Sequence, residues 1–127
     1  MPVDLHLVFL LLCLFEVKHF LCDFPLQRRW MLQKVLPGWE FLMPLTAHVG
    51  VHGAFTLGLV LWTGKYGLWW LALVDIAAHF IMDRIKAGPR YLGRYRDRET
   101  AAYWNALGFD QMVHHFTNFY IVWQLVR

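Results

Sequence analysis

Histidine and aspartate recur in this sequence in pairs four residues apart. The pentapeptides "HFLCD" at 19–23 and "HFIMD" at 79–83 are nearly the same five letters, and each pairs a histidine with an aspartate. Two further pairs with this spacing occur in "HVGVH" and "DQMVH". Imidazole and carboxylate groups are ligands for zinc, iron and manganese. The eight candidate ligands are His19, Asp23, His48, His52, His79, Asp83, Asp110 and His114.

The spacing predicts a metal site inside a helical bundle. Residues i and i+4 lie on one face of an α-helix, about 5–6 Å apart, and bundle cores build metal sites from such inward-facing pairs. Five histidines and three aspartates exceed the four ligands of one tetrahedral ion. We therefore expect two divalent transition metal ions to share them, with zinc favoured over iron and manganese. Two metal-free interpretations stay open, namely a proton or ion relay and polar packing between helices.

The segments that carry these pairs are apolar. Hydrophobic residues make up 58% of the 127 residues, above the roughly 45–50% of an average soluble domain. Four runs, at about 5–24, 41–62, 68–86 and 103–126, are each close to the roughly 20 residues that a membrane-spanning helix needs. The sequence therefore predicts an all-α fold, a four-span transmembrane helix bundle with an inward-facing His/Asp layer. The whole chain, 1–127, is expected to form a single integral membrane domain.

Basic residues gather in the connections after the first and third runs. Nine of the twelve lysines and arginines lie there or at the adjacent end of the third run. The positive-inside rule then places these connections in the cytoplasm and both termini outside a bacterial inner (cytoplasmic) membrane. In that orientation all four pairs lie in one layer just below the cytoplasmic surface.

Four polar residues beside the layer are expected to orient its ligands: Asp75, Gln27, Lys86 and Gln111. Gln27, Lys86 and Gln111 have alternative uses, either in holding a substrate anion or in helix capping and snorkelling. Cys13 and Cys22 lie too far apart along one helix to form a disulfide, and no thiolate metal motif is present. The expected partner is membrane lipid, with a homo-oligomer or a larger membrane complex left open, and no nucleic acid is expected.

Four motifs taken together resemble a known family. They are "HFLCDFPLQRRWMLQK", "HVGVH", "HFIMDRIK" and "DQMVH". In this order they resemble a family of small bacterial and phage integral membrane proteins of unknown function. Its pattern is His-x3-Asp-Phe-x2-Gln, His-x3-His, His-x3-Asp-x2-Lys and Asp-Gln-x2-His. The resemblance covers all four runs and implies a membrane location, but it implies no activity. The motifs are also loosely similar to those of membrane-bound metal-dependent hydrolases with intramembrane His and Asp.

These observations favour a metal-dependent membrane hydrolase that acts on an ester, amide or phosphate of a lipid or lipid-linked substrate. The site lies at the depth of the headgroup–acyl boundary, and the arginine-rich segments 28–34 and 90–98 could hold an anionic headgroup. Orientation in the membrane is the alternative role for these arginines. Two alternative functions remain: a di-iron oxidoreductase acting on an acyl chain or quinone, and a metal or proton transporter or accessory subunit.

Overall fold

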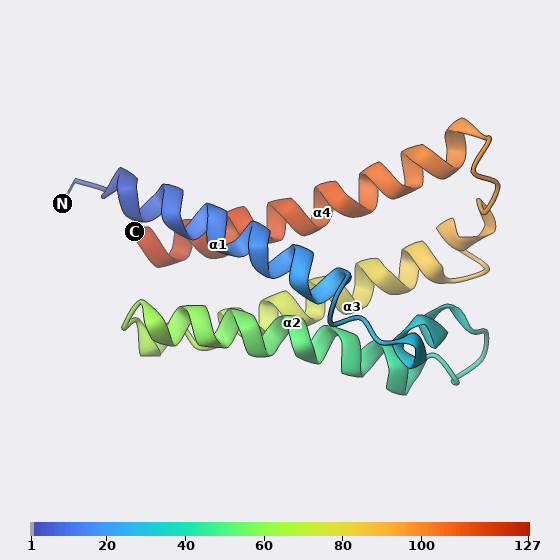
Figure 1. Ribbon diagram of the computed structural model, residues 1–127, viewed down its shortest axis with the longest axis horizontal. Coiled ribbons are helices and arrows are strands. Elements are labelled where there is room, and N and C mark those ends of the chain that lie inside the picture. Colours follow the sequence, from blue (N-terminus) through green and yellow to red (C-terminus); the bar gives the residue numbers. More distant parts are fainter. Residues whose placement is uncertain (1) are drawn as a thin grey trace.

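The chain folds into four long helices joined by one tight and two long connections (Figure 1). The structure is a computed structural model that describes residues 2–127, and all regular structure within them is helical. The predicted all-α fold is therefore confirmed. The α-helices are α1 (Leu5–Asp23), α2 (Leu42–Trp62), α3 (Leu71–Ala87) and α4 (Ala101–Val126), and short 3-10 helices cover Arg29–Val35 (η1), Tyr66–Leu68 (η2) and Leu92–Arg94 (η3).

Local sequence sets the helix ends. The Asp4 carboxylate caps α1 by accepting hydrogen bonds from two backbone N–H groups of the first turn, at 2.9 and 3.3 Å. Pro25 follows two residues after α1, and Pro89 follows two residues after α3, where neither can continue the helix. The Thr100 hydroxyl caps α4 by accepting from a backbone N–H at 3.4 Å. These signals explain why the helices lie close to the predicted runs.

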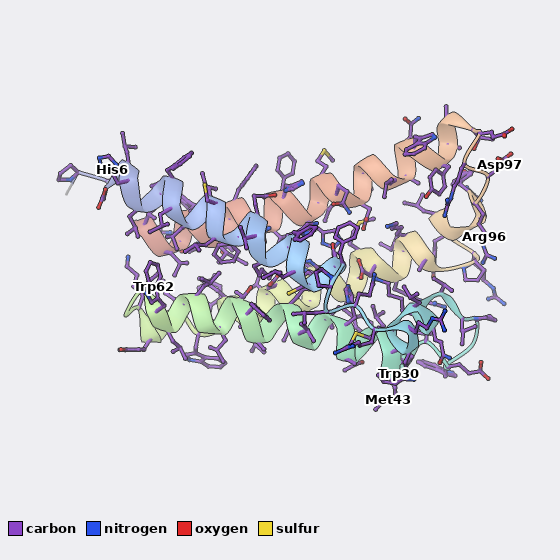
Figure 2. All side chains as sticks on the ribbon, viewed as in Figure 1. His6, Trp30, Met43, Trp62, Arg96 and Asp97 are labelled. Atoms are coloured by element: carbon purple, nitrogen blue, oxygen red, sulfur yellow. The ribbon has the colours of Figure 1, made fainter. Side chains whose placement is uncertain are left out.

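The helices form a bundle in which each packs against the next, and α4 closes the ring against α1. Figure 1 shows both termini and the short turn between α2 and α3 at one end of the bundle. The two long connections lie at the opposite end, hereafter the connection end. Arg96 and Asp97 mark that end in Figure 2, and His6 marks the other. The η1 segment folds back against α2 and α3.

Apolar packing fills the half of the bundle near the termini. This terminal core contains seven buried side chains from all four helices: Leu11, Phe15, Val60, Leu71, Ile121, Val122 and Leu125. Nearer the connection end, α2 and α3 pack closely where a Cβ on Gly53 would collide with the Ile76 side chain. Between the terminal core and the connections, the interior holds a polar layer beside a second apolar cluster of Phe41, Leu45 and Val49.

Two of the four helices are long and apolar enough to cross a membrane, namely α1 and α2. The prediction of four comparable spans is therefore met only in part. Helix α3 has 17 residues, at the short end of the range of about 17–25 residues for a membrane-spanning helix. Helix α4 has 26 residues, but its asparagines, glutamines and histidines lower its hydropathy. The polar side chains that form the interior layer are thus also the reason that α4 is less apolar than a simple span.

Candidate metal centre

The eight predicted ligands come together in the bundle interior, one pair from each helix. Each pair lies on one face of its helix because the helices are regular α-helices through the pairs. Seven of the eight residues are buried, and the Asp23 side chain is 19% exposed. Burying so many polar groups is costly unless each finds a partner. Their contacts divide into two groups of three, each with one aspartate from α1 or α3 and two residues from the following long helix.

The first triad consists of Asp23, His48 and His52. The His52 Nε2 lies 2.9 Å from Asp23 Oδ1, and the His48 Nε2 lies 3.4 Å from the same oxygen. One ligand atom from each residue lies within 4.8 Å of the other two. Two imidazole nitrogens and a carboxylate oxygen at this separation are a ligand set that suits a zinc ion.

The second triad consists of Asp83, Asp110 and His114. The His114 Nε2 lies 3.1 Å from Asp83 Oδ1 and 3.0 Å from Asp110 Oδ1, and all three residues are buried. Their ligand atoms also lie within 4.8 Å of one another. Oδ1 of Asp83 and Oδ1 of Asp110, the inner oxygens of these carboxylates, therefore both lie close to the same imidazole nitrogen. An ion bound among the three atoms would contact all of them.

The two triads touch each other. The His48 Nε2 of the first lies 3.3 Å from Asp83 Oδ2 of the second. The His79 ring lies between the triads, with its centroid 4.0 Å from that of His52 and 4.1 Å from that of His114. Its Nε2 is buried and has no hydrogen-bond partner within residues 2–127. An unpartnered imidazole nitrogen between two ligand groups is a feature that a metal ion would satisfy.

The other nitrogen of His79 is held by a buried polar network. Its Nδ1 lies 2.8 Å from Asp75 Oδ1. The Asp75 carboxylate also accepts from the Lys18 ammonium at 2.6 Å and from the Thr56 hydroxyl at 2.5 Å, both on Oδ2. The hydrogen bond of Nδ1–H goes to the backbone oxygen of Asp75 at 3.2 Å, and it fixes the tautomer of His79 and leaves Nε2 as a free electron-pair donor. Asp75 thus orients a predicted ligand.

Sequence reasoning did not assign Lys18 or Thr56 to the site. Lys18 points off the stripe of His19 and Asp23, so its helix alone suggests no function. The available signal was the pair of opposite charges, Lys18 and Asp75, each isolated in an apolar run. Buried charges need partners, and each is the other's partner.

Lysines bind the outer oxygens of the second triad. The Lys34 Nζ lies 3.0 Å from Asp83 Oδ2, and the Lys86 Nζ lies 3.0 Å from Asp110 Oδ2. Lys86 was expected to flank the layer. Lys34 was not, because it reaches the layer only when η1 folds back over α2 and α3. Each carboxylate therefore offers Oδ1 to the second triad and Oδ2 to a lysine, and Asp83 Oδ2 also lies close to His48 of the first triad.

Two glutamines flank the layer in different ways. The Gln111 Oε1 lies 3.0 Å from His19 Nε2, and its Nε2 donates to Asp110 Oδ2 at 3.1 Å. His19 also lies 3.1 Å from Asp23 Oδ2. Gln27 instead donates to the backbone oxygen of Asp23 at 2.9 Å. Gln111 therefore contacts predicted ligands through its side chain, whereas Gln27 satisfies the end of α1.

His6 and His115, which are not among the predicted ligands, lie outside the triads, as do the predicted ligands His19 and His79. His6 lies at the terminal end of α1 (Figure 2). The His115 Nδ1 lies 2.9 Å from Glu16 Oε1, in a partly exposed pair between α4 and α1. Neither belongs to a candidate ligand group.

Comparison with known proteins identifies a family but no activity. A family model described as "Protein of unknown function (DUF3307)" matches residues 8–127, so the chain belongs to this family. No curated protein and no solved structure matches the chain.

Proposed function

We propose that this member of the DUF3307 family is a metal-dependent membrane hydrolase. Two divalent ions, zinc with iron or manganese as alternatives, would be held by the two triads at the cytoplasmic side of a four-span bundle. The substrate would be a lipid or lipid-linked molecule. The observation that carries the proposal is the unpartnered Nε2 of His79 between two convergent ligand groups.

The donor set fits two ions that share one centre. The first triad supplies two imidazoles and one carboxylate, and the second supplies one imidazole and two carboxylates. His79 is placed to complete either set, and the contact between His48 and Asp83 joins them. Ions bound here would polarise a scissile bond and bring the pKa of a coordinated water towards neutrality. The chain's own part is to hold the ligands on rigid helices and to orient His79 through Asp75.

Exposed apolar side chains support a membrane location for all four helices. Large apolar side chains with more than half of their surface exposed occur on each one, including Phe9 on α1, Met43 on α2, Ile81 on α3 and Phe116 on α4. Such outward-facing residues suit contact with lipid. Exposed Trp30 and Trp62 lie towards opposite ends of the bundle (Figure 2), as interfacial aromatics would.

The orientation follows from the basic connection end. We expect the connection end in the cytoplasm. The test is labelling of intact cells with a membrane-impermeant maleimide, using Arg96→Cys and Lys65→Cys in a Cys13→Ser, Cys22→Ser background. Labelling of Lys65→Cys alone is expected, because residue 65 lies in the short turn at the terminal end. Labelling of Arg96→Cys alone would reverse the orientation.

A proton relay is the second candidate, favoured by a row of closely spaced imidazoles. The ring centroids of His48 and His52 lie 4.9 Å apart. The ring centroid of His79 lies about 4 Å from that of His52 and from that of His114. Transport would require polar groups to continue towards the terminal end. Buried polar groups continue only a short way in that direction, through Lys18, Asp75, Thr56 and Asn118, and the terminal core lies beyond them. The site is therefore one-sided, which favours chemistry at one surface over passage across the membrane.

Elemental analysis of the full chain, purified in detergent without chelator, tests the proposal. Two zinc ions per chain are expected, and chelation should lower the melting temperature, because an ion at 100 times its Kd stabilises the native state by about 2.7 kcal/mol. His6→Ala is the control and should retain both ions. Two irons would favour the oxidoreductase. Absence of metal, with an unchanged melting temperature after chelation, would overturn the proposal in favour of the relay.

A further inference from the structure

A cationic pocket lies beside the second triad at the connection end. It has a volume of about 390 Å³ and is bounded by η1, the end of α3, the segment 92–98 and the start of α4. Four basic side chains line it, Lys34, Lys86, Arg96 and Arg98, and the one carboxylate is Asp83. Because Asp83 also belongs to the second triad, an anion in this pocket would adjoin the candidate metal centre.

Both arginines of this pocket have guanidinium N–H groups that are not used in hydrogen bonds to the described part of the protein. Arg96 uses its Nε to donate to the backbone oxygen of Gly93 at 2.8 Å. The guanidinium of Arg98 has no hydrogen-bond partner within residues 2–127. The two lysines are held on Asp83 and Asp110, as described above. Planar guanidinium groups bind phosphate through paired hydrogen bonds, so a phosphate group is the anion that this lining suits.

An apolar groove continues from the cationic pocket. It has a volume of about 520 Å³ and lies between α3 and α4, where Ile85, Ala102 and Phe109 contribute to its wall. Leu92, Tyr95 and Ala106 line both the groove and the pocket. The two spaces are therefore adjacent, one basic and one apolar. A free phosphate ion would occupy only the first, whereas an amphiphile would occupy both.

We propose that the occupant is a phosphorylated lipid, with its phosphate in the cationic pocket and its hydrocarbon chain in the groove. Its role as the substrate rests on the proposed function. The reaction that this placement suits is hydrolysis of the lipid phosphoester. The water oxygen forms a bond to phosphorus, the bond from phosphorus to the lipid oxygen breaks, and a proton from water ends on that oxygen. The products are a lipid alcohol and inorganic phosphate.

Binding to the full chain in a neutral detergent, loaded with zinc, tests the proposal. The probes are dioctanoyl phosphatidic acid, dioctanoylglycerol and inorganic phosphate. We expect the phosphatidic acid to bind more tightly than either part alone. Arg96→Gln and Arg98→Gln should each weaken its binding about tenfold, since each removes a charge-assisted hydrogen bond. Arg90→Gln, in the same connection but outside both spaces, is the matched control and should bind as the wild type does.

A variant of the groove separates the two parts of the ligand. Phe109→Asn should weaken phosphatidic acid binding and leave inorganic phosphate binding unchanged. Equal affinity for inorganic phosphate and phosphatidic acid would overturn the lipid assignment, as would arginine variants that bind like the wild type. Zinc content measured on the same samples separates this inference from the proposed function. Two zincs with no lipid binding would overturn the inference alone, whereas arginine-dependent lipid binding by protein that holds no zinc, iron or manganese would support the lipid site and overturn the hydrolase.

Discussion

The two triads occupy equivalent positions in two halves of the molecule. Asp83 follows Asp23 by 60 residues, and His114 follows His52 by 62. The hairpin of α1 and α2 therefore repeats in the hairpin of α3 and α4. In each half the odd-numbered helix supplies an aspartate and the even-numbered helix supplies two residues four apart. The two halves thus supply their candidate ligands in the same order along the chain, and their differences show which features belong to each site alone.

The main difference is in charge. At the position where the first triad has His48, the second has Asp110, so one triad is rich in nitrogen and the other in oxygen. Lysines contact only the second triad, and they offset its additional carboxylate. The second triad also adjoins the cationic pocket through Asp83. Under the proposed function, the first triad would chiefly hold an ion, whereas the second would place an ion beside the substrate.

Substitution of Asp83 should have the largest effect on both triads. It contacts His48 of the first triad, His114 of its own and Lys34. Asp83→Ala should abolish binding of both ions, and removing one partner of such buried pairs typically costs about 3–5 kcal/mol of stability. The measurements are metal content and the melting temperature. Asp97→Ala, in the exposed connection, is the matched control. Retention of both ions by Asp83→Ala would show that the triads are independent of it.

Single-histidine variants should separate the two sites. His52→Ala leaves the oxygen-rich triad intact, and His114→Ala leaves the nitrogen-rich triad intact. Each should therefore lose one ion of two. The ion retained by His114→Ala should prefer zinc, and the ion retained by His52→Ala should accept manganese more readily, because carboxylates suit manganese and imidazoles suit zinc. Metal content after competition between zinc and manganese measures this. Identical preferences in both variants would remove the distinction.

Much of this arrangement follows from helix periodicity. A spacing of four residues places both members of a pair on one face of a helix, so the four pairs could be predicted from the sequence. The connections that share one end of the bundle place the pairs at similar depth. Metal binding, the membrane orientation and hydrolysis are still predictions. The family match supports only membership in a family of unknown function.

Contacts between segments that are distant in the sequence could not be predicted from helix periodicity. The tautomer of His79 is set by Asp75, whose own partner Lys18 comes from α1, 57 residues away. Lys34 reaches Asp83 only because η1 packs back onto the bundle. Periodicity within one helix carries no information on either contact. The number of comparable spans was overestimated because the run at 68–86 begins at the last residue of η2 and includes the turn before α3, which is a helix of only 17 residues.

A smaller effect is expected from substitutions in the polar network of Lys18 and Asp75 that holds His79. His19, the corresponding residue of the first half, has no such network within the described residues. Lys18→Met and Asp75→Asn should each lower zinc affinity about 10–100-fold, because partners that orient a ligand typically contribute this much. Lys65→Met, which removes a partly exposed lysine at the terminal end, is the control. The double variant Lys18→Met, Asp75→Asn removes the buried pair together. It should recover melting temperature relative to either single variant without recovering zinc affinity. Recovery of both would show that the network acts only on stability.

The smallest effect should come from Gln111, which connects the two halves. Its amide contacts His19 of the first half and Asp110 of the second, at 3.0 and 3.1 Å. Gln111→Ala removes two neutral or singly charged hydrogen bonds but no ligand, so a loss of about 1–2 kcal/mol in the free energy of unfolding is expected. Both ions should remain bound.

Gln124→Ala is the matched control for Gln111→Ala, because Gln124 lies on the same helix and hydrogen-bonds only Tyr120, at 3.0 Å and in an exposed position. Chemical unfolding of the two variants measures the difference. Because Gln111 contacts both halves, zinc affinity should fall slightly at both sites of Gln111→Ala. A loss confined to the second site would show that Gln111 acts through Asp110 alone, and that the halves communicate only through the contact between Asp83 and His48.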